Sequence, residues 1–442
     1  MDGDSEDSVC CPGSGRTGKG SVGDGISGPG SRSLGRMGFF TLDDFNVRGR
    51  KILVRVDINS PVDERTLRLE DGSKIRSSVP TIRELIDRGA RVAILAHQGR
   101  PGDYDFISLN EHAQYLSQFT GKKIRYVDDI LGPHAMRAIQ NLADGEAILM
   151  QNVRNLSEEQ VKRSPEEHSE SQLVKTLSSK FDLYVNDAFG SSHRAHASLV
   201  GFTPVMPSAA GRLLEREVST LSKVFQTPAR PSTYIFGGTK FSDALQAIEK
   251  LADKDNADNL IIAGLAGYAF LWVLGKRVGA RTEDKIKKDV GEEVAAAARK
   301  LYDRRKEKIQ LPVDGAVEIE DHRVEFDIDK MPGDAAILDI GSASIERFNK
   351  TIMASKTVFL SGPPGMFERE EFCKGTKEMF EAIIESGAYS VIGGGHSGAA
   401  ANKLGLLDKF SYVSTGGGAL ERLMLGKEMP VIEALRASAK KL

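Results

Sequence analysis

The stretch Lys51-Ile52-Leu53-Val54-Arg55-Val56, followed at once by Asp57-Ile58-Asn59, contains the pattern that decides the fold class. A short, mostly apolar run rich in β-branched residues predicts a buried strand, and the polar residues after it mark the strand's carboxyl end. Ligands bind at the carboxyl ends of strands in open α/β sheets, so we expect a small anionic ligand in this half of the chain. The pattern recurs three times there: Arg91–Ala96 before His97, Gln98, Gly99 and Arg100; Ala147–Met150 before Asn152 and Arg154; Leu183–Val185 before Asn186, Asp187 and Arg194.

Amphipathic helices are predicted between these strands. One is expected near Val79–Arg88, with Pro80 in its first turn, and with Lys74 and Arg76 in the loop before it. Alternating strands and helices predict parallel sheets that are covered on both faces. A second series of predicted strands follows in the other half: Ser232–Phe236, Asn259–Ala263, Ala335–Ile340, Lys356–Leu360, Tyr389–Ile392 and Phe410–Val413.

Two prolines, Pro204 and Pro207, and a long predicted helix, Ala209–Phe225, separate the two series and mark a domain boundary. The predicted fold class is therefore α/β, with two doubly wound parallel-sheet (Rossmann-like) domains joined by a hinge helix. We expect a first domain at 37–207, and a hinge helix with a second domain at 208–414. We also expect a segment from about 415 to 442 to return to the first domain.

Composition and charge exclude several classes of protein. The 442-residue chain has a formal net charge of −2, so no overall charge attracts nucleic acid. Its three cysteines cannot form a disulfide framework, which favours a reducing cytoplasm. The longest apolar run, Leu260–Leu274, is shorter than the about 20 residues of a membrane span. We interpret it as a buried strand, a turn and the start of a buried helix, and we expect no membrane partner.

The first 36 residues are dominated by Gly and Ser, and we predict a disordered tail, with Met37 as an alternative true start. Within it, Gly13-Ser14-Gly15-Arg16-Thr17-Gly18 fits GxGxxG. That motif binds nucleotides only between a strand and a helix. Neither is predicted here, so we interpret the match as a chance product of biased composition.

Cationic side chains recur near the predicted anion site: Lys74, Arg76, His97, Arg100, Arg154 and Arg194. Arginine binds carboxylate and phosphate through two parallel hydrogen bonds, so this set suits a small molecule carrying both groups. Asp57 and Asn59 could orient those arginines, accept a ligand hydroxyl, or form an ordinary turn at the strand end, and the sequence leaves these alternatives open. His193 and His196 have no third ligand nearby, which disfavours a metal site.

Glycine clusters follow strands of the second series. Glycines allow close backbone approach, and helix N-termini bind phosphate, so three such clusters predict a nucleotide site. The clusters are Gly237-Gly238-Thr239-Lys240, Gly393-Gly394-Gly395-His396-Ser397 and Ser414-Thr415-Gly416-Gly417-Gly418. A separate rigid loop, Gly362–Glu368, ends in a carboxylate that suits ribose hydroxyls. No nucleophile stands beside a general base, which fits phosphoryl transfer, where positioning and charge stabilisation dominate.

From about residue 45 onward the chain resembles the phosphoglycerate kinase family. Val54–Pro61 is similar to VRxDxNxP, His97–Pro101 to HLGRP, and Gln151–Arg154 to ENxR. Asn186–Ser198 matches NDAFGxxHRAHxS almost letter for letter. In the second half, Gly237–Lys240 resembles GGAK, Leu311–Asp314 matches LPxD, Gly362–Glu368 resembles GPxGxFE, and Ser414–Ala419 resembles STGGGA.

The resemblance implies a monomer that reversibly transfers the acyl phosphate of 1,3-bisphosphoglycerate to Mg-ADP, giving 3-phosphoglycerate and ATP in glycolysis. In reverse, the 3-phosphoglycerate carboxylate would attack the γ-phosphate in line as the domains close. Its catalytic groups would be Lys74 or Arg76, Lys240, and helix N-termini at Gly238 and Gly394. Its phosphoglycerate-binding residues would be Asp57, Asn59, Lys74, His97, Gln98, Gly99, Arg100, Arg154 and Arg194. Its nucleotide-binding residues would be Gly238, Thr239, Lys240, Glu368, Gly393, Gly394, Gly395, His396 and Ser397.

Three positions depart from the family pattern. Lys74 stands where the family has a substrate-binding arginine, Ala244 replaces a second lysine, and His396 replaces the aspartate of GGGDS. The two nucleotide-side changes are similar to archaeal-type members. Because the missing aspartate is linked to the metal–nucleotide, the residue that holds Mg²⁺ is left open.

Two alternatives from other classes remain at this point. A dinucleotide-dependent dehydrogenase would need GxGxxG at its first strand–helix turn, where this chain has Asp57-Ile58-Asn59-Ser60-Pro61. A binding protein without activity would explain the three departures, and absence of turnover would favour it.

Overall fold

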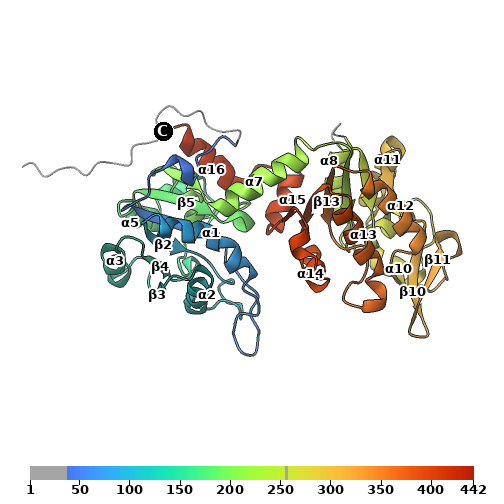
Figure 1. Cartoon of the computed structure of the whole chain (residues 1–442), viewed down its shortest axis with the longest axis horizontal. Helices are drawn as coiled ribbons and strands as arrows, with labels where there is room; N and C mark the ends of the chain where they lie inside the picture. The colour runs from blue at the N-terminus through green and yellow to red at the C-terminus, as the bar shows by residue number, and fades with distance from the viewer. Residues whose placement is uncertain (1–36, 254–256) are drawn as a thin grey trace, which may run out of the picture.

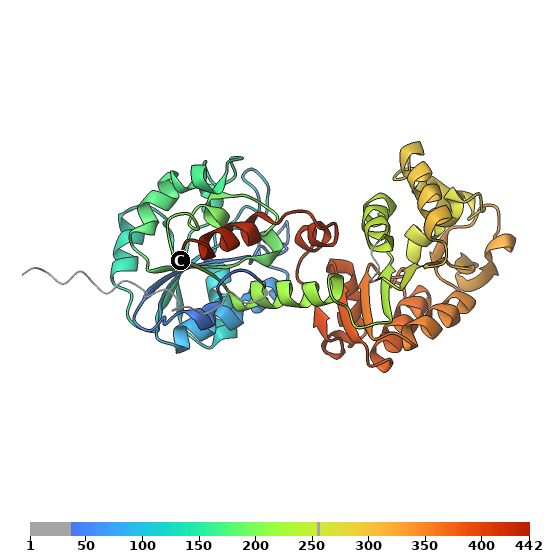
Figure 2. The ribbon, with the colours of Figure 1, turned by 90° about the horizontal axis from the view of Figure 1, so that it is seen from above.

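The computed structural model describes residues 37–253 and 257–442. Two lobes lie side by side, and helix α7 (Arg212–Phe225) runs between them (Figures 1 and 2). The predicted tail, with its GxGxxG match, lies outside the described residues. Within the described residues no helix is long and apolar enough to cross a bilayer.

The first lobe is built on a parallel sheet with the strand order β3-β4-β2-β1-β5-β6. Alternate residues of β1 belong to different cores: Ile52 and Val54 pack into one, and Leu53 into the other. Both faces of the sheet are therefore covered, as predicted. The strands are β1 (Lys51–Val56), β2 (Arg91–Leu95), β3 (Ile124–Val127), β4 (Ala147–Met150), β5 (Leu183–Asp187) and β6 (Ser208–Ala210). The helices are α1 (Ser73–Asp87), α2 (Asn110–Thr120), α3 (Pro133–Gln140), α4 (Pro165–Ser169), α5 (Gln172–Ser178) and α6 (Ala197–Val200).

The second lobe is built on another parallel sheet, with the order β15-β14-β13-β7-β8-β9. Its strands are β7 (Ser232–Phe236), β8 (Asn259–Ile262), β9 (Ile309–Gln310), β13 (Thr357–Ser361), β14 (Tyr389–Gly393) and β15 (Tyr412–Val413). Its helices are α8 (Phe241–Ala252), α9 (Gly264–Val273), α10 (Ala280–Ile286), α11 (Glu292–Arg305), α12 (Ser342–Met353), α13 (Lys374–Glu385) and α14 (Gly395–Lys403). The predicted fold class is confirmed, and the run Leu260–Leu274 divides into β8 and α9 as expected.

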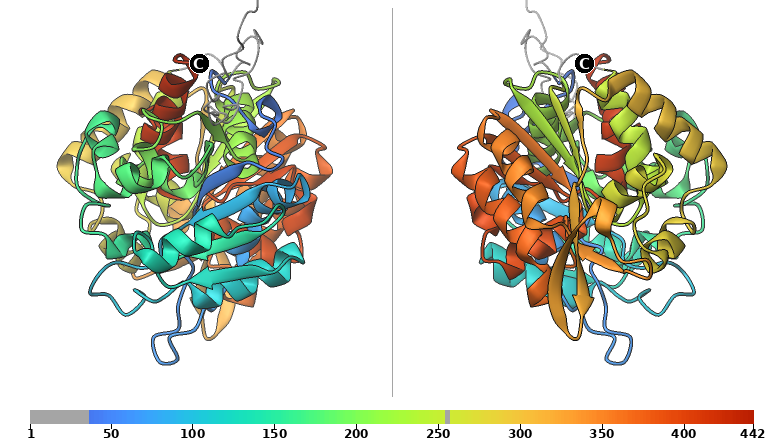
Figure 3. Two further views of the ribbon diagram at one scale, coloured as in Figure 1. Left: turned by 90° about the vertical axis from the view of Figure 1, so that its left-hand side faces the viewer. Right: turned by 90° about the vertical axis from the view of Figure 1, so that its right-hand side faces the viewer.

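A small antiparallel sheet, missed from the sequence, lies at the far end of the second lobe. Its order is β11-β10-β12, with β10 at Asp314–Ile319, β11 at His322–Asp327 and β12 at Ile337–Asp339. The prediction that Ala335–Ile340 is a parallel strand of the main sheet was wrong, because β12 pairs antiparallel with β10. Figure 3 (right) shows the β10–β11 hairpin projecting from this end of the molecule.

The first turns of two helices differ from the prediction. Helix α1 begins at Ser73 rather than near Val79, because the Asp71 carboxylate accepts a hydrogen bond from the Ser73 backbone N–H. Lys74 and Arg76 therefore lie on the helix, not in a loop, and Pro80 lies inside it. Helix α7 begins at Arg212 rather than Ala209, because Ser208–Ala210 pairs with β5 as strand β6.

The first two turns of α7 are held by buried carboxylates. Asp187 at the end of β5 accepts hydrogen bonds from the backbone N–H groups of Leu213 (2.8 Å) and Leu214 (3.1 Å). Glu217, on the next turn, accepts from Ser414 Oγ (2.9 Å) and Thr415 N (2.7 Å). Helix α7 is thus fixed to the end of a strand in each lobe.

The chain crosses between the lobes a second time near its end. Helix α15 (Gly418–Met424) contacts the short turn Phe189–Ser191, and α16 (Pro430–Ala439) packs against β6 and α6 of the first lobe. Figure 2 shows α16 lying on the first lobe, alongside α7.

Candidate active site

The centre of the first-lobe site is a buried arginine that sequence reasoning missed. Arg55 projects from β1 with a relative exposure of 1%. Its Nε donates to Ser198 Oγ at 2.7 Å, and its Nη2 lies 3.1 Å from His97 Nδ1. A cation within an otherwise apolar strand was the signal available in the sequence, because a charged side chain is buried only where polar partners compensate its charge.

Asp57, at the end of β1, lies beside this arginine. Its carboxylate accepts hydrogen bonds from Ser191 Oγ (2.8 Å) and the Asn59 backbone N–H (3.3 Å). Burial opposes its charged form, but the charges of Lys74 and Arg55 and the hydrogen bond from the Ser191 hydroxyl lower the pKa of Asp57. Burial and the charge of Arg55 keep the pKa of His97 well below its ordinary value, so His97 is neutral at pH 7. Lys74 is then the cation that, with Arg55, keeps Asp57 ionised.

The loop after β2 completes one side of the site. Gly99 adopts a φ of +61°, and a Cβ there would lie 2.4 Å from the Asp105 backbone, so only glycine fits. The Gly99 N–H donates to Asn59 Oδ1 at 2.8 Å, and its carbonyl accepts from Arg154. The predicted residues Asn59, Gly99 and Arg154 are therefore brought together.

The side chain of Gln98, a predicted ligand-binding residue, joins two loops in the structure. Its side chain is fully buried, its Oε1 accepts from the Ser60 N–H at 2.9 Å and lies 3.1 Å from His112 Nε2, and its Nε2 donates to the Ser60 carbonyl at 3.0 Å. These bonds use its amide to fasten the two strand-end loops together.

Positive charge is in excess around these residues. Burial and the nearby charges of Arg194 and Arg55 lower the pKa of Arg154 to about 10, and its Nε is buried without a protein partner. Arg194 is half-buried, with its Nε 3.2 Å from His193 Nε2, and Arg100 is exposed. The buried Glu159, bonded to Ser198 Oγ at 2.6 Å, is a second carboxylate of this cluster. Five cations face two carboxylates, which is the charge pattern of an anion site.

Lys74 and Arg76 lie apart, although both are on the first turn of α1. Lys74 acts on Asp57, whereas the Arg76 guanidinium lies 4.0 Å from the centre of the Phe119 ring. Stacking on an aromatic ring is a stable surface position for arginine. The geometry favours Lys74 over Arg76 as the cation that reaches a ligand.

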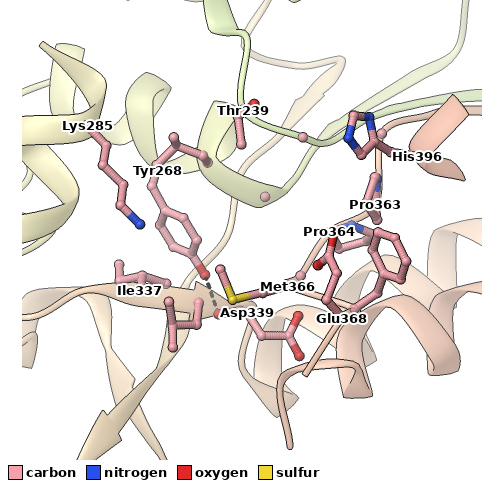
Figure 4. Close-up of a pocket in the computed structure, with 17 residues that line it drawn as sticks. Thr239, Tyr268, Lys285, Ile337, Asp339, Pro363, Pro364, Met366, Glu368 and His396 are labelled. Carbon is pink, nitrogen blue, oxygen red and sulfur yellow. Dashed lines mark hydrogen bonds between the residues drawn. The ribbon is translucent and has the colours of Figure 1, made fainter. Parts of the chain in front are cut away.

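A cavity of about 270 Å³ lies in the second lobe (Figure 4). Predicted residues Gly238, Thr239, Glu368 and His396 line it. Sequence reasoning missed most of its wall, which comes from three further segments: Gly264, Leu265 and Tyr268 of α9, Lys285 of α10, and Ile337, Leu338 and Asp339 of β12. Its surface is mainly apolar, as expected of a site for a flat ring system.

A second cavity of about 260 Å³ adjoins the first and shares Gly238, Thr239, Gly362 and His396 with it. It is lined by the glycine clusters at the starts of α8 and α14, together with Lys240, Asp243 and Glu421. Gly394 has a φ of +88° and precedes the first turn of α14, whose N–H groups suit a phosphate. Lys240 Nζ extends into solvent, 4.0 Å from Asp243.

Two predicted residues shape this cavity from behind. A Cβ on Gly393 would lie 2.3 Å from Leu420, so its lack of a side chain lets the strand pack. Ser397 is fully buried, and its hydroxyl accepts from the Gly362 N–H at 2.8 Å, which ties the two glycine loops together.

Candidate ligands for a magnesium ion are few. Among the residues that the structure describes, no three His, Cys, Asp or Glu side chains gather as a metal site. Burial lowers the pKa of His196 to about 3, helped by Arg55 and Arg194, so His196 lies in a cationic environment that repels metals. Mg²⁺ needs only one or two carboxylates when nucleotide phosphates supply the rest. Asp243 and Glu421, which line the second cavity, are carboxylates of this kind.

The first lobe thus holds a cluster of cations suited to an anion, and the second lobe holds a glycine-lined cavity. The family model for phosphoglycerate kinase matches residues 42–427. The chain belongs to the phosphoglycerate kinase family. Its activity is the reversible transfer of a phosphoryl group between 1,3-bisphosphoglycerate and ADP, giving 3-phosphoglycerate and ATP, with the nucleotide as its Mg²⁺ complex.

Named relatives and solved structures agree with the family model. The chain is 42% identical over 403 residues to a phosphoglycerate kinase from Methanothermus fervidus, covering 91% of this chain and 98% of the relative. It is 42% identical over 404 residues to the one from Sulfurisphaera tokodaii, covering 90% and 95%. The crystal structure of phosphoglycerate kinase from Pyrococcus horikoshii has a TM-score of 0.83 at 36% identity, covering 91% of this chain and 100% of that one. The Coxiella burnetii structure has a TM-score of 0.78 at 31% identity, covering the same shares.

The predicted family, enzyme class and reaction are thereby confirmed. The dehydrogenase alternative is removed, and catalysis is favoured over the binding-only alternative. The predicted small-molecule partners, which are the two phosphoglycerates and the adenine nucleotides, follow from the family.

Proposed function

We propose that the first lobe binds the phosphoglycerate and that the second lobe binds the Mg-nucleotide in this reaction. The observation that carries the assignment is the contrast in charge and shape. Buried and half-buried cations surround Asp57 in the first lobe, while a mainly apolar cavity adjoins glycine loops in the second. The domains correspond to residues 37–207 with about 415–442, and to 208–414 including the hinge helix.

Within the first lobe, Arg154, Arg194 and Arg100 bind the phosphate and carboxylate of the phosphoglycerate, and Asp57 and Asn59 bind its hydroxyl. The unpartnered Nε of Arg154 supports this, because a buried N–H group without a partner is costly unless a ligand accepts its hydrogen bond. His97, Gln98 and Gly99 hold the loops that present these groups.

Within the second lobe, the base and ribose occupy the cavity of Figure 4, and Glu368 lies at its edge for the ribose hydroxyls. The phosphates extend into the adjoining cavity, toward Gly238, Thr239 and Lys240 and the α14 N-terminus at Gly393–Ser397. Asp243 or Glu421 provides a carboxylate for the magnesium ion.

In the transfer step, the carboxylate of 3-phosphoglycerate attacks the terminal phosphate of ATP directly, and the two lobes move together to bring the reactants into line. Lys74, Lys240 and the N–H groups near Gly238 and Gly394 stabilise the charge on the transferring group. Closure excludes water, which protects the acyl phosphate from hydrolysis. We further propose that the enzyme acts as a monomer in the cytoplasm.

The test measures by calorimetry whether each variant loses affinity for only one of the two ligands. Binding of 3-phosphoglycerate and of Mg-ADP is measured separately for the full chain and for Arg194→Ala, Lys240→Ala and Lys250→Ala. We expect Arg194→Ala to weaken only 3-phosphoglycerate and Lys240→Ala to weaken only Mg-ADP. Lys250→Ala, on the exposed side of α8, is the control that changes neither. Equal losses for both ligands in one variant would contradict the assignment of the lobes.

A further inference from the structure

The small antiparallel sheet forms the floor of the cavity that we assign to the base and ribose. Ile337, Leu338 and Asp339 of β12 line this cavity. Tyr268, on the cavity wall, donates its hydroxyl to the backbone carbonyls of Asp314 (2.9 Å) and Asp339 (3.2 Å), and Figure 4 shows it pointing toward Asp339. The wall and the floor are therefore held by one sheet.

An arginine on the edge strand crosses this sheet to reach the floor. Arg323 lies on β11, which pairs with β10 and not with β12. Its Nη1 donates to Asp339 Oδ2 at 2.8 Å, and its Nη2 donates to the Ile340 carbonyl at 2.8 Å. The Asp339 side chain is fully buried, and that of Arg323 is 13% exposed. The guanidinium thus links β11 directly to β12, although β10 lies between these two strands in the sheet.

Asp339 in turn supports the loop Gly362–Glu368, which covers the cavity. A Cβ on Gly365 would lie 2.1 Å from Asp339 Oδ1, so the loop backbone rests directly on this carboxylate. The Met366 N–H donates to the Leu338 carbonyl at 2.8 Å, and the Gly375 N–H donates to Asp339 Oδ2 at 2.9 Å. A shift of the carboxylate would therefore move the loop that carries Pro363 and Glu368.

The carboxylate needs its cation. Burial raises the pKa of Asp339 to about 6, and the Gly375 amide and Arg323 keep it from rising further. Removing one partner of a buried ion pair leaves an uncompensated charge, which the structure relieves by moving or by binding a proton. Either change would alter the surface on which Gly365 rests.

We propose that Arg323 is a positioning residue for the nucleotide: by fixing Asp339, it sets the height of the Gly362–Glu368 loop over the base and ribose. The hairpin β10–β11 is then a structural part of the nucleotide site, although no residue of β11 lines the cavity. This inference rests on the proposed function, which places the nucleotide in this cavity.

The test uses the full chain with Arg323→Gln and Arg323→Lys. We expect Arg323→Gln to raise the Kd and KM for Mg-ADP about tenfold, with the KM for 3-phosphoglycerate within about twofold of wild type. Arg323→Lys keeps the charge but cannot reach both Asp339 and Ile340. We therefore expect its Kd for Mg-ADP to lie between the values for wild type and Arg323→Gln. The control is Lys276→Gln, which removes the exposed pair with Asp329 just after β11 and leaves all constants unchanged.

If Arg323→Gln raised the KM values for Mg-ADP and 3-phosphoglycerate equally, or changed neither, the positioning role would be overturned. If Arg323→Gln does not fold, Arg323→Lys carries the test, and an unchanged Kd for Mg-ADP overturns the inference. Leu338→Trp, which fills the cavity, distinguishes failure of the proposed nucleotide location from failure of the positioning role of Arg323. If it leaves Mg-ADP binding intact, the proposed location of the nucleotide is wrong. If it abolishes binding while Arg323→Gln does nothing, only the positioning role fails.

Discussion

The two candidate half-sites are built from different materials. The proposed phosphoglycerate side is built around side chains that are buried and held by hydrogen bonds: the exposed fractions of Arg55, His97 and Arg154 are 1%, 4% and 7%. On the nucleotide side, the polar side chains Thr239, Lys240, Glu368 and His396 are exposed, and the shape comes from glycines and backbone. A small anion is thus met by a prearranged set of charges, whereas a large nucleotide is met by a surface whose contours are set by the chain's path.

This contrast concerns what each ligand requires. A compact ligand of high charge must be desolvated by fixed partners, and those partners must be held apart against their own repulsion. A nucleotide carries much apolar area and binds through shape. Changes to single charges should therefore be severe in the first lobe, and changes to exposed polar side chains should be milder in the second.

The largest expected effect is that of Lys74→Ala. The change removes one of the two cations, the other being Arg55, that lower the pKa of Asp57, and it leaves the negative charge of Asp57 in the anion site. We expect kcat/KM for 3-phosphoglycerate to fall about 100-fold, because hydrogen bonds to charged groups are the strong ones. Arg76→Ala is the matched comparison on the same helix turn, and it should lower kcat/KM for 3-phosphoglycerate by less than about threefold. Steady-state kinetics check both, and a larger loss in Arg76→Ala would reverse our ranking of the two cations.

A second way to sharpen the comparison substitutes one glycine in each half. Gly99→Ala forces a Cβ into the Asp105 backbone at a φ of +61°, so we expect the free energy of unfolding to fall by about 2–3 kcal/mol. Gly395→Ala meets no atom within 4 Å and should change it by less than about 0.5 kcal/mol. Urea unfolding measures both. Equal costs would show that the glycines of the two loops are constrained alike.

The third prediction concerns the helix between the lobes. Burial raises the pKa of Asp187 to about 7, so the folded protein binds this proton more tightly than the unfolded chain. Stability must then fall as pH rises from about 4 to about 7, by on the order of a few kcal/mol. Asp187→Asn keeps one oxygen for the α7 N–H groups and should remove this slope. Chemical unfolding at pH 5 and pH 8 tests it, and an unchanged slope in the variant would contradict the assignment.

The smallest effect is expected for His396→Asp, which restores the family's usual residue. His396 is exposed, and Asp243 and Glu421 already line the same cavity. We expect kcat and the magnesium concentration for half-maximal activity to change by less than about threefold. A tenfold fall in that magnesium concentration would show that the chain lacks a carboxylate that it needs.

The difference between the halves also explains what the sequence could reveal. Asp57, Asn59 and Arg154 follow regular strands, so their meeting at one sheet edge was predictable from order along the chain. Arg55 was not, because strand periodicity does not say why a cation is buried. The cavity wall at Tyr268, Lys285 and Leu338 was missed because its residues come from three segments that only tertiary packing brings together. The β10–β11 hairpin escaped prediction because its turn, Glu320-Asp321, has positive φ without glycine or asparagine.

Because helix α16 is synthesised last, the first lobe cannot complete its packing until translation is nearly finished. The helix packs against β6, and its Arg436 Nε donates to the Met37 carbonyl at 3.1 Å, so the first lobe is closed by residues made about 400 positions later. During translation the second lobe can acquire all its strands while the first still lacks a covering helix. We therefore expect nascent chains ending near Met429 to be cleaved by protease in the first lobe and protected in the second. Equal protection of both would show that the first lobe matures without α16.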